Sequence, residues 1–328
     1  MRKHGRYYLN RYRRIQYRSR NAALKEGVFI LIISLALASA CTLTADQPIR
    51  LSPGPHLFID DYLIAEQRNL ERRINQPNRL PNPVVTGPED ENFDTWITVL
   101  RDPETRMFRM WYNSAAGKHQ SHLAYIESRD GIEWIRPHRV LDDPSHIQYG
   151  ATVIDEGPEW PDSNTRYKFA WWSRGGFMIA VSPDGFVWKD IAPEPVIIIN
   201  HDVSSLCYDP IRKRYIALLQ EKSQLGGKLK EIRRIPHSSV STDLLNWKRP
   251  WPIVIPDERD EGITQYYGIG GVMARGELLI GMLKVLRDDV VAEGAPEGAF
   301  GVGYTVLAWS RDTETHCSSP LSNATATA

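Results

Sequence analysis

The sequence predicts an all-β fold built from repeated short strands, and three observations predict it. A seven-residue pattern, Ser-x-Asp-x-x-x-Trp, occurs three times, and its tryptophans are 54 and 59 residues apart. Short alternating apolar segments with turn residues between them flank the pattern. After residue 50, no stretch shows a sustained 3.6-residue apolar period, which would mark an amphipathic helix.

The copies of the pattern set the order of the predicted units. They run from Ser128 to Trp134, from Ser182 to Trp188 and from Ser241 to Trp247. A fourth copy begins at Ser310 but has His316, 69 residues after the third tryptophan, in the tryptophan position. Gly or Leu after each motif aspartate closes a turn. We expect each tryptophan to begin an outer strand and to bury its ring against a neighbouring unit.

Strand signals surround the copies. Alternating segments precede three of them, at residues 123–126, 178–181 and 302–307. Upstream, Asp102-Pro103 and Asp209-Pro210 each separate two apolar runs, as in a tight hairpin turn. Four short strands in each unit of roughly 40 to 50 residues, with an aromatic signature, are typical of a β-propeller. We therefore predict a single propeller domain over residues 51–312, with a further strand near residues 58–64 outside the repeats.

Composition and charge exclude several classes of function. The chain has 40 Lys+Arg and 40 Asp+Glu, a formal charge of zero, and 42% hydrophobic residues, as in a globular protein. A nucleic-acid partner is not expected, because affinity for phosphate backbones needs many clustered basic residues. The three cysteines Cys41, Cys207 and Cys317 cannot build a disulfide framework, and none has zinc-site spacing. We expect no metal and no cofactor.

Residues 1–41 read as a targeting segment. Residues 2–25 are rich in Arg and Lys without an acid, and 27–40 form an uncharged apolar run of 14 residues. That length suits a signal peptide and is short for a membrane span of about 20 residues. Cys41 follows Ala38-Ser39-Ala40, as in an imperfect lipobox. A lipoprotein, a cleaved signal and an uncleaved anchor stay open, and each predicts export to the periplasm, the cell surface or the inner membrane.

With these residues in view, the chain resembles five-bladed propellers of the glycoside hydrolase family 43 and 32 type, and exported propellers of that kind from planctomycete-like bacteria. The resemblance rests on the three motif copies and on residues 56–64, 201–210 and 256–268. It implies carbohydrate as the partner. The expected function is therefore an exported glycosidase-like propeller that acts on or binds carbohydrate, with truncation as a reason for it to be inactive. The alternative is a non-catalytic propeller that binds glycan or protein at the cell surface.

The resemblance also implies where a site would lie. Enzymes of this type place carboxylates at the start of innermost strands, where one acts as base or nucleophile and another as acid. Asp94 and Asp202 precede predicted first strands and are the catalytic candidates, with Trp96 and Tyr267 as sugar-stacking candidates. The weaker acidic candidates are Asp60, Asp61, Asp260 and Glu261. For any of these acids, the alternative is a turn carboxylate bonded to backbone N–H groups.

The last residues depart from the pattern. Residues 313–328 contain no aromatic residue and no alternation, so we expect a disordered tail. The repeat breaks off within its fourth copy. We therefore expect an incomplete propeller of about four blades, in which a fifth blade is missing through truncation or is supplied by another chain.

Overall fold

The computed structural model describes residues 48–51, 56–73, 75–86, 93–136, 138–199, 201–224, 232–254, 265–287, 290–299 and 301–311. The chain divides into two units, residues 1–51 and 52–328, and every strand belongs to the second. The targeting segment with Cys41 and the tail at 313–328 lie outside the described residues. In the part that is described, no helix is long and apolar enough to cross a membrane.

The fold is all-β, as predicted, and its strands form four antiparallel sheets in chain order. Blade 1 contains β1 (Phe93–Arg101), β2 (Phe108–Gly117), β3 (Gln120–Ser128) and β4 (Arg139–Val140). Blade 2 contains β5 (Tyr149–Asp155), β6 (Tyr167–Ser173), β7 (Gly176–Ser182), β8 (Lys189–Asp190) and β9 (Ile197–Ile198). A short 3-10 helix, η1 (Ser163–Thr165), precedes β6.

Blade 3 contains β10 (Ser204–Asp209), β11 (Arg214–Gln224), β12 (Ile232–Ser241) and β13 (Trp251–Pro252). Blade 4 contains β14 (Gln265–Arg275), β15 (Leu278–Arg287) and β16 (Val302–Ser310). This last sheet therefore has three strands among the described residues, where the repeat predicts four. The difference follows from the sequence, because the motif that leads into the fourth strand is complete in the first three blades alone.

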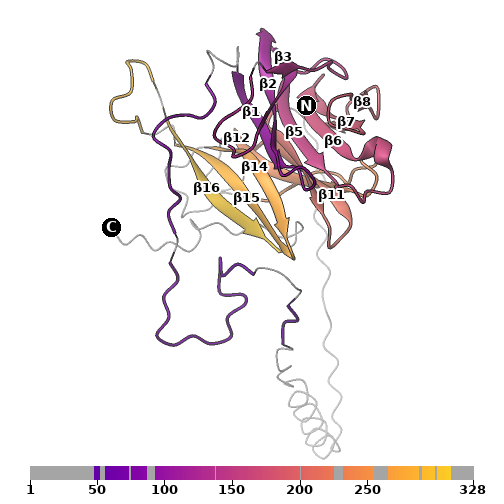
Figure 1. Ribbon diagram of the computed structural model, residues 1–328. Helices are drawn as coiled ribbons and strands as arrows, with labels where there is room; N and C mark the ends of the chain where they lie inside the picture. Colours follow the sequence, from indigo (N-terminus) through magenta and orange to yellow (C-terminus); the bar gives the residue numbers. More distant parts are fainter. Residues whose placement is uncertain are drawn as a thin grey trace, which may run out of the picture. The chain divides into compact units, whose positions relative to one another are not determined.

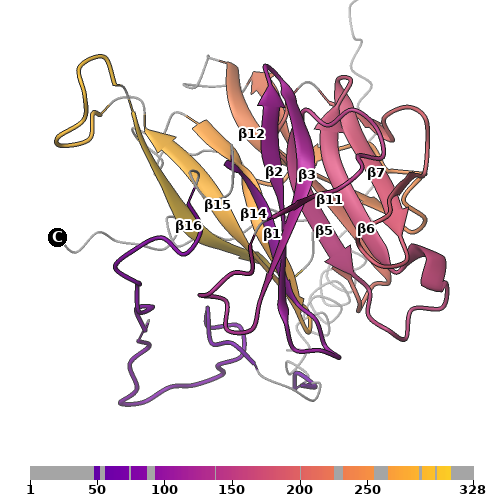
Figure 2. The same ribbon diagram turned by 45° about the horizontal axis from the view of Figure 1, so that its top comes forward.

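The four blades form a propeller. The first strand of each blade, β1, β5, β10 and β14, is the innermost one, and consecutive inner strands are neighbours. Figures 1 and 2 show the sheets following one another from β1–β3 to β14–β16. Because all four inner strands run in the same sense, their first residues meet at one end of the axis. This end is called the opening below.

The repeated motif makes the same turn in three blades. In each copy the serine hydroxyl donates to the aspartate Oδ1, at 3.0 Å in the first two copies and 2.9 Å in the third. The same Oδ1 accepts the two N–H groups that follow the turn, at 2.7 to 3.0 Å. Backbone N–H donors and the serine lower the pKa of Asp130, and the pKa of Asp243 is lowered first of all by a hydrogen bond from the Asn246 side chain and then by the same kinds of donor. The motif aspartates are therefore structural groups on the blade edges, as the sequence predicts.

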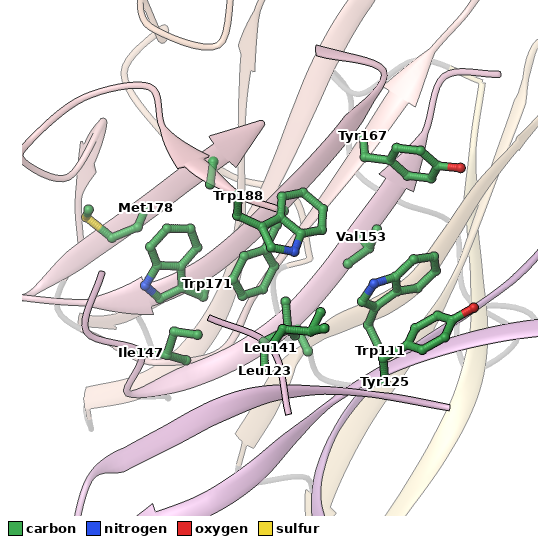
Figure 3. Packing of buried hydrophobic residues seen from close by; sticks show 13 residues of the cluster. Trp111, Leu123, Tyr125, Leu141, Ile147, Val153, Tyr167, Trp171, Met178 and Trp188 are labelled. Atoms are coloured by element: carbon green, nitrogen blue, oxygen red, sulfur yellow. The ribbon is translucent and has the colours of Figure 1, made fainter. Parts of the chain in front are cut away.

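The motif tryptophans of blades 2 and 3 occupy equivalent places, on the side of the blade that faces the preceding blade, and Trp134 lies on the outer face of blade 1. Trp188 packs in the core between blades 1 and 2, with its ring 5.5 Å from that of Phe169. Trp247 packs between blades 2 and 3 against Phe177. Figure 3 shows the first of these cores, in which Trp188 lies among side chains of both blades. The prediction that these rings are buried between units is confirmed for Trp188, whereas Trp247 is partly buried between blades 2 and 3 and Trp134 is buried on the outer face of blade 1.

The described residues of 56–86, which we call the arm, contact the outer faces of blades 1 and 4. Val84 and Val85 pack against the outer face of blade 1, beside Trp134. Ile59 packs against Leu278, Ile280 and Trp309 on the outer face of blade 4. The arm therefore contacts both the first and the last blade.

A carboxylate fastens the arm to blade 4. Asp60 accepts hydrogen bonds from Trp309 Nε1 at 2.9 Å and from both terminal nitrogens of Arg311 at 2.6 and 2.7 Å. The guanidinium of Arg311 also lies over the ring of Tyr62. The expectation of a strand at 58–64 is wrong: these residues form a turn, because the Asp60 carboxylate accepts the N–H of Tyr62 and Ile64 N–H donates to the Asp61 carbonyl.

Candidate functional site

An axial cavity of about 1020 Å³ lies between the inner strands. All four blades contribute to its wall, because each inner strand turns alternate side chains toward the axis. Small residues such as Ala151, Ser204 and Gly270 keep the cavity wide. The larger and polar lining residues are Trp96, Asp155, Glu156, Trp160, Cys207, Tyr208, Met273, Met282, Lys284 and Thr305.

Trp96 lies at the opening, near the start of β1, and lines the cavity. Its half-buried ring packs against the core between blades 1 and 2. Lys284 of β15 reaches it from blade 4, with Nζ 5.3 Å from the ring centroid. The first and fourth blades therefore meet at the opening through this contact.

Asp202 stands just before β10, at the same end of the axis, next to Val203, which lines the cavity, although Asp202 itself is not among the lining residues. Its carboxylate forms an ion pair with His201 Nδ1, and its side chain is 31% exposed. Burial raises the pKa of Asp202, but the hydrogen bond and charge of His201, together with the charge of Arg234, outweigh that effect and leave the pKa lowered. Asp202 is therefore an ionised carboxylate near neutral pH, suited to act as a base or nucleophile and not as an acid.

Blades 3 and 4 approach each other closely beside Asp202. A Cβ on Gly268 would lie 2.6 Å from Val203 Cγ1, so the backbone of β14 needs a glycine here. Tyr267, the residue before it, has the guanidinium of Arg234 5.0 Å from its ring centroid. Tyr267 is thus beside Arg234, whose charge also acts on Asp202, but it is not among the residues that line the cavity.

The other acidic candidates divide into three groups. Asp94 belongs to β1, two residues before Trp96, and its side chain is outside the described part of the chain. Asp60 and Asp61 lie in the arm, where Asp60 binds Arg311 and Asp61 pairs with Arg72, so neither faces the cavity. This corrects their assignment as weaker candidates, and the turn-carboxylate alternative holds for Asp60. Asp260 and Glu261 lie outside the described residues.

The far end of the cavity holds two acids that sequence reasoning missed. Asp155 ends β5 and binds Arg166 through both carboxylate oxygens, at 2.7 and 2.9 Å. Glu156 follows, and its Oε1 lies 3.7 Å from Lys168 Nζ; these two side chains are 4% and 2% exposed. Burial raises the pKa of Glu156 and lowers that of Lys168.

Trp160 completes the far end of the cavity. Its ring centroid lies 3.9 Å from Lys168 Nζ, so the ring covers the ammonium of the buried pair. The signal in the sequence was the run Asp155-Glu156 directly after Val153-Ile154. That run alone does not reveal a lysine partner 12 residues later.

The acids at the two ends are too far apart to work as one pair. Glu156 hydrogen-bonds to Tyr215, the cross-strand partner of Tyr208 near the end of β10, whereas Asp202 lies before the start of β10. From Ser204 to Tyr208 alone, four residues of strand at about 3.3 Å each span about 13 Å. Glycosidase carboxylates lie ~5 to 9.5 Å apart. Glu156 and Asp202 therefore do not have the separation of a glycosidase pair.

Among the described residues, no group of three His, Cys, Asp or Glu side chains is arranged to hold a metal ion. No family model matches the chain, and no curated protein matches it significantly.

Several solved structures are similar in shape. One is a fructofuranosidase from Schwanniomyces occidentalis complexed with fructosylnystose, with 13% identity, a TM-score of 0.41, and coverage of 65% of this chain and 43% of that one. A structure described as a glycoside hydrolase has 11% identity and a TM-score of 0.46, with coverage of 70% and 74%. The arabinofuranosidase Arb93A from Fusarium graminearum has 10% identity, a TM-score of 0.43 and coverage of 70% and 67%. This chain spans less than half of the fructofuranosidase.

Proposed function

We propose that this chain is an exported propeller that binds a carbohydrate in its axial cavity and hydrolyses it at the opening. The observation that carries the proposal is the combination found there: an aromatic ring, Trp96, lining a cavity of about 1020 Å³, and an ionised carboxylate, Asp202, at the same end. Sugar sites combine a concave pocket, an apolar ring and a few polar groups in this way.

The chemistry assigns different roles to the two carboxylates. Asp202, whose pKa is lowered by His201 and Arg234, acts as the base or nucleophile. Asp94 of β1 is the proposed acid, because it is the acidic residue nearest in sequence to Trp96 at the opening. A protonated acid is needed to give a proton to the leaving oxygen of the glycosidic bond.

The test measures hydrolysis of a panel of aryl glycosides and polysaccharides by the chain and by two variants, Asp94→Asn and Asp202→Asn. Each substitution should abolish turnover and leave the thermal unfolding midpoint nearly unchanged. Asp142→Asn is the matched control, because Asp142 is exposed and does not line the cavity. Turnover that survives in both variants would overturn the assignment of the pair.

A second function, glycan binding without hydrolysis, is favoured by one observation. The Asp202 carboxylate is paired with His201. A carboxylate held in place by such a partner is suited to accept a hydrogen bond from a sugar hydroxyl. Isothermal titration with the glycans of the panel separates the two functions. If the chain binds a glycan of the panel but hydrolyses none, and if Asp202→Asn weakens that binding, the chain is a binding protein and not an enzyme.

Export is the remaining part of the proposal. It is supported by the basic leader, the apolar run at 27–40 and Cys41, all of which are features of the sequence. Membrane attachment through Cys41 or through an uncleaved anchor would hold the propeller at the outer side of the inner membrane.

A further inference from the structure

Among the residues that the structure describes, one charged group that lines the cavity has no counter-charge. Asp155 is paired with Arg166 and Glu156 with Lys168, so the acids of the far end are neutralised by neighbours. Lys284 lines the same cavity, is exposed, and forms no ion pair with any carboxylate that the structure describes. The described wall of the cavity therefore carries one uncompensated positive charge.

The position of Lys284 is set by the fold. It is the cross-strand neighbour of Gly268, the glycine whose backbone packs against Val203. Val203 follows Asp202, so Lys284 and Asp202 lie at the same end of the cavity. A sugar with a reacting bond near Asp202 would have Lys284 within its reach.

The ring of Trp96 holds the ammonium in place without neutralising it. At 5.3 Å from the ring centroid, Lys284 Nζ is attracted by the negative face of the indole. This attraction limits the freedom of a long side chain but supplies no proton acceptor and no negative charge. The donors of the ammonium stay available to a ligand.

We propose that the ligand is an anionic carbohydrate, a sugar that carries a carboxylate or a sulfate group, and that Lys284 binds this group. The proposal rests on the proposed function and names its class of substrate. An anionic sugar gains a charge-assisted hydrogen bond from Lys284, whereas a neutral sugar gains a weaker one. Arg234, at the ring of Tyr267, places a second cation beside Asp202 at the opening.

The experiment compares the affinities of three oligosaccharide probes by isothermal titration. The probes are an oligogalacturonate, its methyl ester, and a sulfated galactan oligosaccharide. We expect the chain to bind at least one of the two anionic probes about 10- to 100-fold more tightly than the neutral ester, as one charge-assisted hydrogen bond allows. Preference for the oligogalacturonate identifies a carboxylate ligand, and preference for the galactan identifies a sulfate ligand.

Variants of Lys284 test whether this residue causes the preference. Lys284→Met should reduce the affinity for the preferred anionic probe to that for the ester, and Lys284→Arg should retain the preference. Lys189→Met is the matched control, because Lys189 is an exposed lysine on β8 away from the cavity. An equal loss for anionic and neutral probes in Lys284→Met would show a merely structural role and overturn the inference.

The two proposals fail in different ways. If the chain binds neutral glycans as tightly as anionic ones, the inference on Lys284 is wrong and the proposed function stands. If the chain binds no carbohydrate of either kind, the proposed function itself is wrong.

Discussion

Replacing Arg109 by methionine should weaken the interface between blades 1 and 2. Arg109 is 9% exposed. Its guanidinium donates hydrogen bonds to three oxygens: Tyr125 OH at 3.2 Å, Tyr167 OH at 2.6 Å and the Asp184 carbonyl at 2.9 Å. It also lies 3.6 Å from the Asp102 carboxylate. Its Cζ is 4.9 to 5.6 Å from four aromatic ring centroids, contributed by both blades.

The magnitude follows from what methionine leaves behind. Methionine keeps the apolar part of the packing but leaves the Tyr167 hydroxyl and the Asp184 carbonyl without their donor, and Asp102 without its countercharge. Removing one partner of a buried charged network costs about 3 to 5 kcal/mol. For a domain of this size, that loss lowers the unfolding midpoint by roughly 6 to 20 °C.

Thermal and urea unfolding, followed by circular dichroism, measure the change. Arg129→Met is the control, because Arg129 is exposed, and it should change the unfolding free energy by less than about 0.5 kcal/mol. If Arg109→Met lowers the unfolding free energy by no more than the control does, the contacts of the Arg109 guanidinium with the rings and oxygens do not stabilise the interface, and the reasoning is refuted.

Three further predictions concern the arm, a tight turn and export. The pKa of Asp60 is lowered, first of all by its hydrogen bond with Arg311, so this contact stabilises the fold above the ordinary pKa of 3.8 and is lost as the pH falls below it. Asp60→Asn should make the arm protease-sensitive at neutral pH, and equal cleavage of both proteins would contradict this. Gly185→Ala should be more destabilising in urea than Gly157→Ala: both glycines have positive φ, but only at Gly185 would the Cβ meet another residue, Trp111 Cζ2 at 2.9 Å. Cys41→Ser should release the exported chain from the membrane fraction if Cys41 is lipidated, and unchanged fractionation and migration would exclude lipidation.

Local patterns in the sequence predicted most of the fold. The serine and aspartate side chains of each motif accept hydrogen bonds from backbone N–H groups three residues further along the chain. Residues close together in the sequence therefore specify the turn. The strands beside it follow from short alternating runs. The Arg101-Asp102-Pro103 triplet likewise proves to be a turn, in which Asp102 accepts the N–H groups of Glu104 and Thr105. These features need no knowledge of distant contacts.

The contacts that define the cavity could not be predicted in the same way. Trp96 lies on β1 in the first blade, and Lys284 lies on β15 in the last blade. The two side chains come together only when the propeller forms, and no pattern of neighbouring residues in the sequence indicates their contact. The pairing of Glu156 with Lys168 depends on the register of two strands that flank a long loop. The assignment of Asp94 and Asp202 as a catalytic pair stays a prediction, although Asp202 is placed at the opening.

The arm has a consequence for the order in which this chain can fold. Its carboxylate, Asp60, lies 251 residues before its partner Arg311. During synthesis on the ribosome, Asp60 emerges early, and all four blades are synthesised before Arg311. Contacts of such long sequence separation form late, because the closure of the intervening chain must come first. The contacts of Val84 and Val85 with blade 1 can therefore form early, whereas those of Ile59 and Asp60 with blade 4 form last, and the apolar outer face of blade 4 is covered only once blade 4 is complete.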